Sequence, residues 1–284
     1  MSNTAILLIH CPDQTGIIST VSEFLFFHNG NIIDIDQHVD IDNKRFFMRA
    51  EWEIDGFNIP PENIYTIFMN TIGNRFQMTC QVQFTTKKPR MALFVSKMQH
   101  ASLDILSRWY SGEWDVEIPL IISNHPDSRP IAEKFGIDFY EFKITAENKA
   151  EQEQKEITLL KANNIDFVVL ARYMQVISPS FINEFPNQII NIHHSFLPAF
   201  PGAKPYHSAF KRGVKIVGAT AHYVTEDLDA GPIIAQDIAH ITHRDSIDEL
   251  VRKGRDIEKR VLSQAVWLQI RHRILPFDNR TIIF

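Results

Sequence analysis

The chain has 284 residues, of which 44% are hydrophobic and 22% charged, with 11 glycines and 14 prolines. This length predicts two domains, or one large domain with an appendage, and the composition excludes a collagenous, low-complexity or disordered chain. The net charge of −5 provides no excess of basic residues for phosphate groups, so we expect a small-molecule partner and no nucleic acid.

Two features of the sequence bear on the compartment. No stretch reaches the roughly 18 uninterrupted apolar residues of a membrane span, and residues 1–4 lack the basic start of a secretion signal. Cys11 and Cys80 are too few for a disulfide framework, and we expect both to be buried and reduced. The sequence therefore predicts a cytoplasmic protein that does not associate with a membrane.

The first 85 residues predict a small α+β domain. Apolar or alternating runs indicate strands, and apolar residues at helical spacing indicate two helices between them. The expected strands are 4–9, 33–39, 45–54 and 77–84, and the expected helices are 17–29 and 61–72. The order β-α-β-β-α-β is that of a ferredoxin-like domain.

This N-terminal part resembles an ACT domain, a small regulatory module that senses amino acids. The stretch Pro12-Asp13-Gln14-Thr15-Gly16-Ile17 stands where that family has the turn before its first helix. The resemblance implies an amino-acid effector such as methionine or glycine, bound between subunits, and hence a homo-oligomer, either a dimer or a tetramer. Gly16 itself leaves two interpretations open, a close approach of the chain to the helix start or a ligand contact.

A polar segment that ends at Pro89 predicts a linker after this domain. We expect an ACT-like regulatory domain at residues 1–85, a linker at 86–90 and a second domain at 91–284. Residues 1–88 contain six basic and ten acidic side chains, so most of the net charge belongs to the first domain.

The second domain alternates short apolar strands with helices. The strands expected at 90–95, 117–122, 138–142, 167–170 and 189–192 are continuously apolar, which is typical of a parallel sheet buried on both faces. We therefore predict a doubly wound, Rossmann-type α/β domain with its site at the carboxyl ends of the strands. A short helix at 206–212, strands at 215–225 and 232–239, and a final helix from Ser246 complete it.

Polar side chains follow the strand at 189–192. Asn191 and His193 alternate there, so both side chains are expected to face the same crevice, one as an uncharged donor and one as an acid or base. Asp227 and Asp229 follow the next strand and are candidates for a carboxylate that orients the imidazole. This combination suits carbonyl chemistry.

The motifs Asn191-x-His193, Ser195-x-Leu197-Pro198 and Val224-Thr225-Glu226-x-x-Asp229-x-Gly231 resemble the catalytic signature of the formyltransferase family that uses 10-formyltetrahydrofolate. The resemblance implies that Asn191 binds the formyl oxygen as it becomes an oxyanion, that His193 moves the protons and that Asp229 pairs with His193. It also implies a folate pocket formed by Met174, Gln175, Val176, Ile177, Val224, Thr225 and Glu226.

The acceptor of the formyl group depends on the turn after the first strand of this domain. In the glycinamide ribonucleotide formyltransferases a glycine-rich turn there cradles the acceptor's phosphate, whereas residues 96–101 of this chain contain no glycine. Water is then the remaining acceptor. An ACT-like domain before a formyltransferase-like domain also resembles the layout of the formyltetrahydrofolate deformylases.

That second resemblance implies hydrolysis of 10-formyltetrahydrofolate to formate and tetrahydrofolate. It further implies that the formate supplies purine biosynthesis and that the reaction balances the one-carbon folate pools. No cofactor is expected, because the folate is the substrate. No metal is expected either, because the adjacent residues His193 and His194 point apart and His207 adds no conventional ligand spacing.

Several assignments stay open at this stage. His194 and His222 are either supports of the catalytic residues or satisfied core histidines, and Lys97 and His100 either line the site or begin a solvated helix. Two other functions also remain: folate-dependent formyl transfer to a nucleotide or an aminoacyl-tRNA, and amino-acid sensing with a vestigial catalytic domain. The presence of Asn191, His193 and Asp229 argues against the last of these.

Overall fold

The computed structural model describes residues 3–198 and 205–284, and the chain forms two compact units. The N-terminal unit contains the chain up to Lys88 together with His272–Leu275 and Ile282–Phe284. The larger unit contains Pro89–Arg271 and Pro276–Thr281. None of the helices in the described part of the chain is long and apolar enough to cross a membrane.

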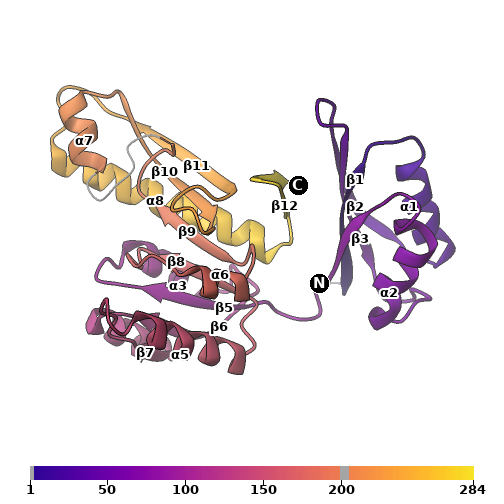
Figure 1. Cartoon of the computed structure of the whole chain (residues 1–284), viewed down its shortest axis with the longest axis horizontal. Coiled ribbons are helices and arrows are strands. Elements are labelled where there is room, and N and C mark those ends of the chain that lie inside the picture. Colours follow the sequence, from indigo (N-terminus) through magenta and orange to yellow (C-terminus); the bar gives the residue numbers. More distant parts are fainter. Residues whose placement is uncertain (1–2, 199–204) are drawn as a thin grey trace. The chain divides into compact units, whose positions relative to one another are not determined.

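The N-terminal unit is a four-stranded antiparallel sheet with its helices on one face (Figure 1). Its strands lie in the order β2-β3-β1-β4, and the elements follow one another as the sequence predicted. They are β1 (Thr4–Pro12), α1 (Ile17–Phe27), β2 (Ile32–Asp40), β3 (Arg45–Glu53), α2 (Pro61–Phe68), which continues into a π-helical turn (Met69–Gly73), and β4 (Thr79–Phe84).

Alternation along the strands decides which side chains enter the core of this unit. Leu7, Met48 and Trp52 project from the sheet and pack with Leu25 and Phe68 of the two helices. The chain enters α1 through Gly16, whose φ of 89° is a conformation that glycine adopts without strain. This φ, and not the expected close approach of the chain, accounts for the glycine, because a Cβ on Gly16 would meet no atom within 4 Å.

A buried arginine explains why a piece of the C-terminus groups with this unit. Arg49 on β3 pairs with Asp34 at 2.9 Å and Glu51 at 2.6 Å, and its Nε donates to the carbonyl of His272. The expected second domain at 91–284 therefore differs from the observed division, because His272–Leu275 and Ile282–Phe284 belong to the N-terminal unit.

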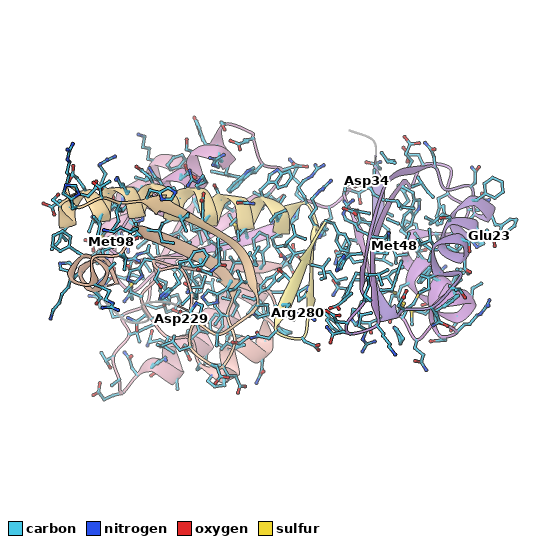
Figure 2. All side chains as sticks on the ribbon, turned by 90° about the horizontal axis from the view of Figure 1, so that it is seen from above. Glu23, Asp34, Met48, Met98, Asp229 and Arg280 are labelled. Atoms are coloured by element: carbon cyan, nitrogen blue, oxygen red, sulfur yellow. The ribbon has the colours of Figure 1, made fainter. Side chains whose placement is uncertain are left out.

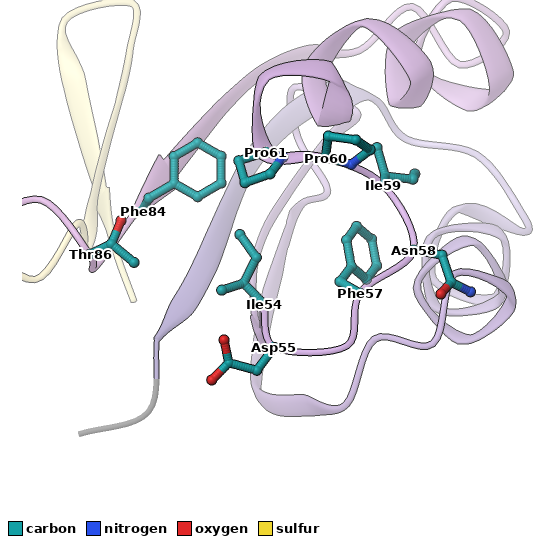
Figure 3. A pocket seen from close by; sticks show the side chains of 9 residues that line it. All are labelled: Ile54, Asp55, Phe57, Asn58, Ile59, Pro60, Pro61, Phe84 and Thr86. Atoms are coloured by element: carbon teal, nitrogen blue, oxygen red, sulfur yellow. The ribbon is translucent and has the colours of Figure 1, made fainter.

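The N-terminal unit also contains an open pocket of about 450 Å³ (Figure 3). Most of the residues that line it are apolar, among them Ile54, Phe57 and Phe84. Asp55 and Asn58 are among the polar residues of the lining.

The larger unit is built around a seven-stranded sheet in the order β11-β10-β9-β8-β5-β6-β7. Its elements are β5 (Arg90–Val95), α3 (His100–Tyr110), β6 (Glu117–Ser123), α4 (Arg129–Phe135), β7 (Asp138–Glu141), α5 (Lys149–Ala162), β8 (Phe167–Ala171), α6 (Pro179–Glu184), β9 (Ile189–His193), α7 (Pro205–Arg212), β10 (Ile216–Tyr223), β11 (Ile233–His240) and α8 (Ile247–Ile270). The residues of the hairpin formed by β12 (Ile274–Phe277) and β13 (Arg280–Ile283) are divided between the two units.

Five strands, β5 to β9, run parallel, as the continuous apolar pattern predicted. The last two strands, β10 and β11, run antiparallel to their neighbours and were not distinguished by that pattern. Helices α5 and α6 cover one face of the sheet and α3 and α8 the other, so β8 in the centre is buried throughout (Figure 1). The strand order reverses between β5 and β8, and crevices at such points are where open α/β sheets bind ligands.

Candidate active site

The site begins at the carboxyl end of β9. Asn191 and His193 project to one side of this strand, whereas Ile190 and Ile192 alternate with them and are buried. The antiparallel partner β10 places His222 opposite Asn191 and Thr220 opposite His193. Two neighbouring strands therefore bring two histidines and an amide to the same edge of the sheet.

Asp229 reaches this edge from the loop between β10 and β11 (Figure 2). A Cβ on Gly231 would lie 1.9 Å from the carbonyl oxygen of Tyr223, so only glycine lets the loop fold back so closely onto β10. Asp229 itself has a φ of 56°, a left-handed conformation that aspartate tolerates better than most residues. This backbone turn directs the carboxylate toward β9.

The carboxylate meets the imidazole of His193. Asp229 Oδ2 lies 3.1 Å from His193 Nδ1, and the hydrogen bond from His193, with a smaller contribution from the nearby His222, holds the pKa of Asp229 well below its usual range. The carboxylate can only accept, so Nδ1 carries a proton and the lone pair of the neutral ring is on Nε2. His193 is 5% exposed, and its Nε2 has no hydrogen-bond partner among the described residues.

His222 is a buried neighbour of Asn191 and Asp229, with 1% of its surface exposed. Its Nδ1 donates to the carbonyl of Tyr223 at 2.9 Å, which leaves Nε2 as the acceptor in the neutral ring. Asn191 Nδ2 lies 3.2 Å from that Nε2, and Asp229 Oδ1 lies 3.6 Å from it. Of the two interpretations left open by the sequence, contact with the site is the one the geometry supports.

The other histidines take different positions. His194 is buried, with its ring 5.1 Å from that of His193 and 6.1 Å from that of Tyr206. His207 lies exposed on α7. Within residues 3–198 and 205–284, no three histidine, cysteine or carboxylate side chains are grouped as metal ligands would be.

Most of the expected folate residues line one small cavity beside Asn191, His222 and Asp229, with a volume of about 50 Å³. Its other lining residues are Leu170, Gln175, Val176, Ile177, Val224, Thr225, Glu226 and Leu228. Met174 is the exception. Its backbone has a φ of 63° and its side chain is 57% exposed, so it does not line the cavity. Residues 199–204, which follow Pro198 of the motif, lie outside the described residues.

The loop that carries Gln175 and Val176 is anchored by two buried carboxylates of α5. Tyr173 donates its hydroxyl hydrogen to Glu156 at 3.0 Å, and the Ser178 amide donates to Glu153 at 3.1 Å. These anchors were not predicted from the sequence. They could have been recognised from the sequence, because the spacing of Glu153 and Glu156 puts them on the same helix face as Ile157 and Leu160.

Comparison with known proteins extends over the whole chain. The sequence profile of the formyl transferase family matches residues 89–266. A Synechocystis protein named formyltetrahydrofolate deformylase is 54% identical over 281 residues, which cover 99% of this chain and 98% of that protein. A Bacillus subtilis protein of the same name is 44% identical, covering 98% of this chain and 93% of that protein.

Solved structures agree. A formyltetrahydrofolate deformylase from Pseudomonas syringae pv. tomato superposes with a TM-score of 0.97 at 43% identity, covering 100% of this chain and 95% of that chain. A glycinamide ribonucleotide transformylase from Symbiobacterium toebii gives a TM-score of 0.67 at 29% identity, covering 71% of this chain and 96% of that chain.

Proposed function

We propose that this chain, which belongs to the formyltetrahydrofolate deformylase family, hydrolyses 10-formyltetrahydrofolate to formate and tetrahydrofolate. One observation carries the mechanism: His193 is held through Nδ1 by Asp229, while its buried Nε2 has no partner within the described part of the chain. A base oriented in this way accepts a proton from water.

In the proposed reaction a water oxygen attacks the formyl carbon and His193 Nε2 takes the proton that the water loses. The formyl oxygen becomes an oxyanion, and the Asn191 amide donates a hydrogen bond to it. The tetrahedral intermediate then collapses, the bond between the formyl carbon and N10 breaks, and N10 takes the proton from the His193 imidazolium. Formic acid releases its own proton to water and leaves as formate.

The folate ring is proposed to bind in the cavity beside Asn191 and Asp229. That cavity has a volume of about 50 Å³, and the exposed side chains of Val176 and Leu228 are among those that line it. Leu170 and Ile177 supply apolar walls for a flat ring, and backbone groups are available for its polar edge.

The main alternative is transfer of the formyl group to a nucleotide or an aminoacyl-tRNA. Residues 96–99, which connect β5 to α3, contain no glycine, and Ser96 is buried there with its hydroxyl bonded to the Arg172 carbonyl. Purified protein with 10-formyltetrahydrofolate alone distinguishes the two reactions. Formate released at a steady rate without an acceptor supports hydrolysis, whereas release that requires an added amine would establish transfer.

The proposal extends to the wider setting of the enzyme. We assign the N-terminal unit a regulatory role of the ACT type, with an amino-acid effector bound in a homo-oligomer, and a vestigial catalytic domain is then unnecessary. The two buried thiols, Cys11 and Cys80, support a cytoplasmic location. The reaction needs neither metal nor nucleotide. The formate that it releases supplies purine biosynthesis, and the reaction balances the one-carbon folate pools. Unchanged kinetics across a panel of amino acids would exclude the regulatory assignment.

A further inference from the structure

A second group of buried polar side chains lies where the strand order reverses. Arg172 follows β8 and Ser96 follows β5, and a hydrogen bond from the Ser96 hydroxyl to the Arg172 carbonyl joins the two strand ends. The Arg172 side chain is 13% exposed. Its Nε and Nη1 atoms are buried and have no hydrogen-bond partner among residues 3–198 and 205–284.

Glu258 of α8 holds this arginine without satisfying its donors. One Glu258 oxygen accepts from the Tyr206 hydroxyl at 2.8 Å and the other from His100 Nε2 at 2.8 Å. Arg172 Nε lies 3.6 Å from the second oxygen, within the range of an ion pair and beyond that of a hydrogen bond. A guanidinium cannot give up its charge, so Arg172 keeps a cation and open N–H groups in a buried place.

Arg172 and the catalytic residues leave the sheet at the same edge. Strands β8 and β9 run parallel with Leu170 opposite Asn191, and Arg172 follows the end of β8 with a left-handed backbone, at a φ of 63°. Ser195, two residues after His193, also has a buried hydroxyl with no partner in the described chain. Polar atoms without hydrogen-bond partners in the described chain, from the segments after both strands, therefore lie at one edge of the sheet.

We infer that Arg172 is the binding residue for the formate produced at His193. This inference rests on the proposed function. The adjacent Nε and Nη N–H groups of a guanidinium match the two oxygens of a carboxylate, and unfilled buried donors are costly unless a ligand completes them. Formate acquires its two equivalent oxygens and its charge only after the C–N bond has broken. Arg172 does not line the folate cavity.

Titration of the folded protein with ¹³C-labelled formate, without folate, tests the inference by NMR line broadening. We expect saturable binding in the wild type and at least a tenfold weaker affinity in Arg172→Gln. Arg172→Lys should have an intermediate affinity, because lysine keeps the positive charge but lacks the two adjacent N–H groups of the guanidinium. Arg252→Gln, at an exposed position of α8, is the matched control and should bind as the wild type does.

Three results would overturn the inference: no saturable binding in the wild type, equal affinity in the wild type and both Arg172 variants, or displacement of formate by chloride as readily as by unlabelled formate. The last result would mean a general anion site. The measurement needs no turnover, so its failure is distinct from a failure to release formate from 10-formyltetrahydrofolate. Should Arg172→Gln not fold, Arg172→Lys and the wild type still decide the question.

Discussion

His193 Nδ1 and Asp229 Oδ2 lie 3.1 Å apart, with His193 at the end of β9 and Asp229 in the loop that follows β10. Because the pKa of Asp229 is held well below its usual range, chiefly by the hydrogen bond from His193, the carboxylate stays ionised in the whole neutral range. The permanent negative charge of Asp229 beside Nδ1 fixes the ring orientation and stabilises the imidazolium that forms when Nε2 accepts a proton.

The first prediction concerns the loss of the negative charge of Asp229. Asp229→Asn should fold and bind folate, yet lose about two to four powers of ten in kcat, because an amide can bond the wrong imidazole tautomer and cannot stabilise the cation. The measurement is formate release at saturating folate. Asp227→Asn, at the exposed position two residues earlier, is the control and should keep its rate. A variant Asp229→Asn with nearly normal turnover would remove Asp229 from the mechanism.

The same pair predicts a response to acid. A carboxylate with a lowered pKa stabilises the folded state above its ordinary value near 4, and this stabilisation is lost as the pH falls below that value. Asp229→Asn should therefore show a shallower loss of unfolding free energy between pH 5 and pH 3 than the wild type. Denaturant unfolding at several pH values checks this, and parallel curves for the two proteins would contradict it.

The oxyanion donor gives a third prediction. Asn191→Ala should lower kcat by roughly two to three powers of ten, the usual cost of losing one such donor. The effect on KM should be small, because the donor acts mainly on charge that develops in the transition state. Steady-state kinetics separate the two constants. A change confined to KM would show that Asn191 binds the ground state of the folate.

His222 should act through Asn191, because its Nε2 accepts from the Asn191 amide at 3.2 Å. We expect His222→Phe to lower kcat about tenfold and to have little further effect when Asn191 is already alanine, since the group it positions is then gone. A double-mutant cycle of the four proteins measures this coupling. Effects that simply multiply would mean that His222 acts elsewhere, for instance on Asp229 at 3.6 Å.

Much of this site follows from local patterns in the sequence. The period of two places Asn191 and His193 on one side of β9, and the parallel sheet places strand ends at one edge. The resemblance to the formyltransferases selected Asp229 over Asp227, because two carboxylates in one loop cannot be separated by periodicity. The structure separates them by the left-handed backbone at Asp229 and the tight approach of Gly231.

Other features depend on tertiary contacts that have no local signature. The direction of β10 and β11 was not predicted, because an apolar strand has the same pattern in either direction. Met174 was assigned to the folate cavity from its apolar side chain, whereas its backbone φ of 63° leaves the side chain exposed. Glu258 was not singled out from the sequence, because only the fold brings His100 and Tyr206 to it.

A buried carboxyl under the folate loop gives the last prediction. Glu156 is fully buried, one oxygen accepts from Tyr173, and the other has no hydrogen-bond partner within the described residues. Burial, with a smaller contribution from the charge of Glu153, raises the pKa of Glu156 to about 7. A carboxyl whose pKa is higher in the folded state favours folding when protonated, so this contribution is lost as the pH rises from about 4.5 to above 7.

Glu156→Gln should therefore be less sensitive to pH than the wild type, and at pH 8 more stable, by up to about 3 kcal/mol in free energy of unfolding, because the amide carries no charge to bury. Urea unfolding at pH 5, 6, 7 and 8 measures the difference. Glu151→Gln, at an exposed position of the same helix, should leave the pH dependence as it is. If Glu156→Gln and the wild type lose stability in parallel between pH 5 and pH 8, Glu156 is ionised throughout, and the Tyr173 hydroxyl then bonds a buried carboxylate.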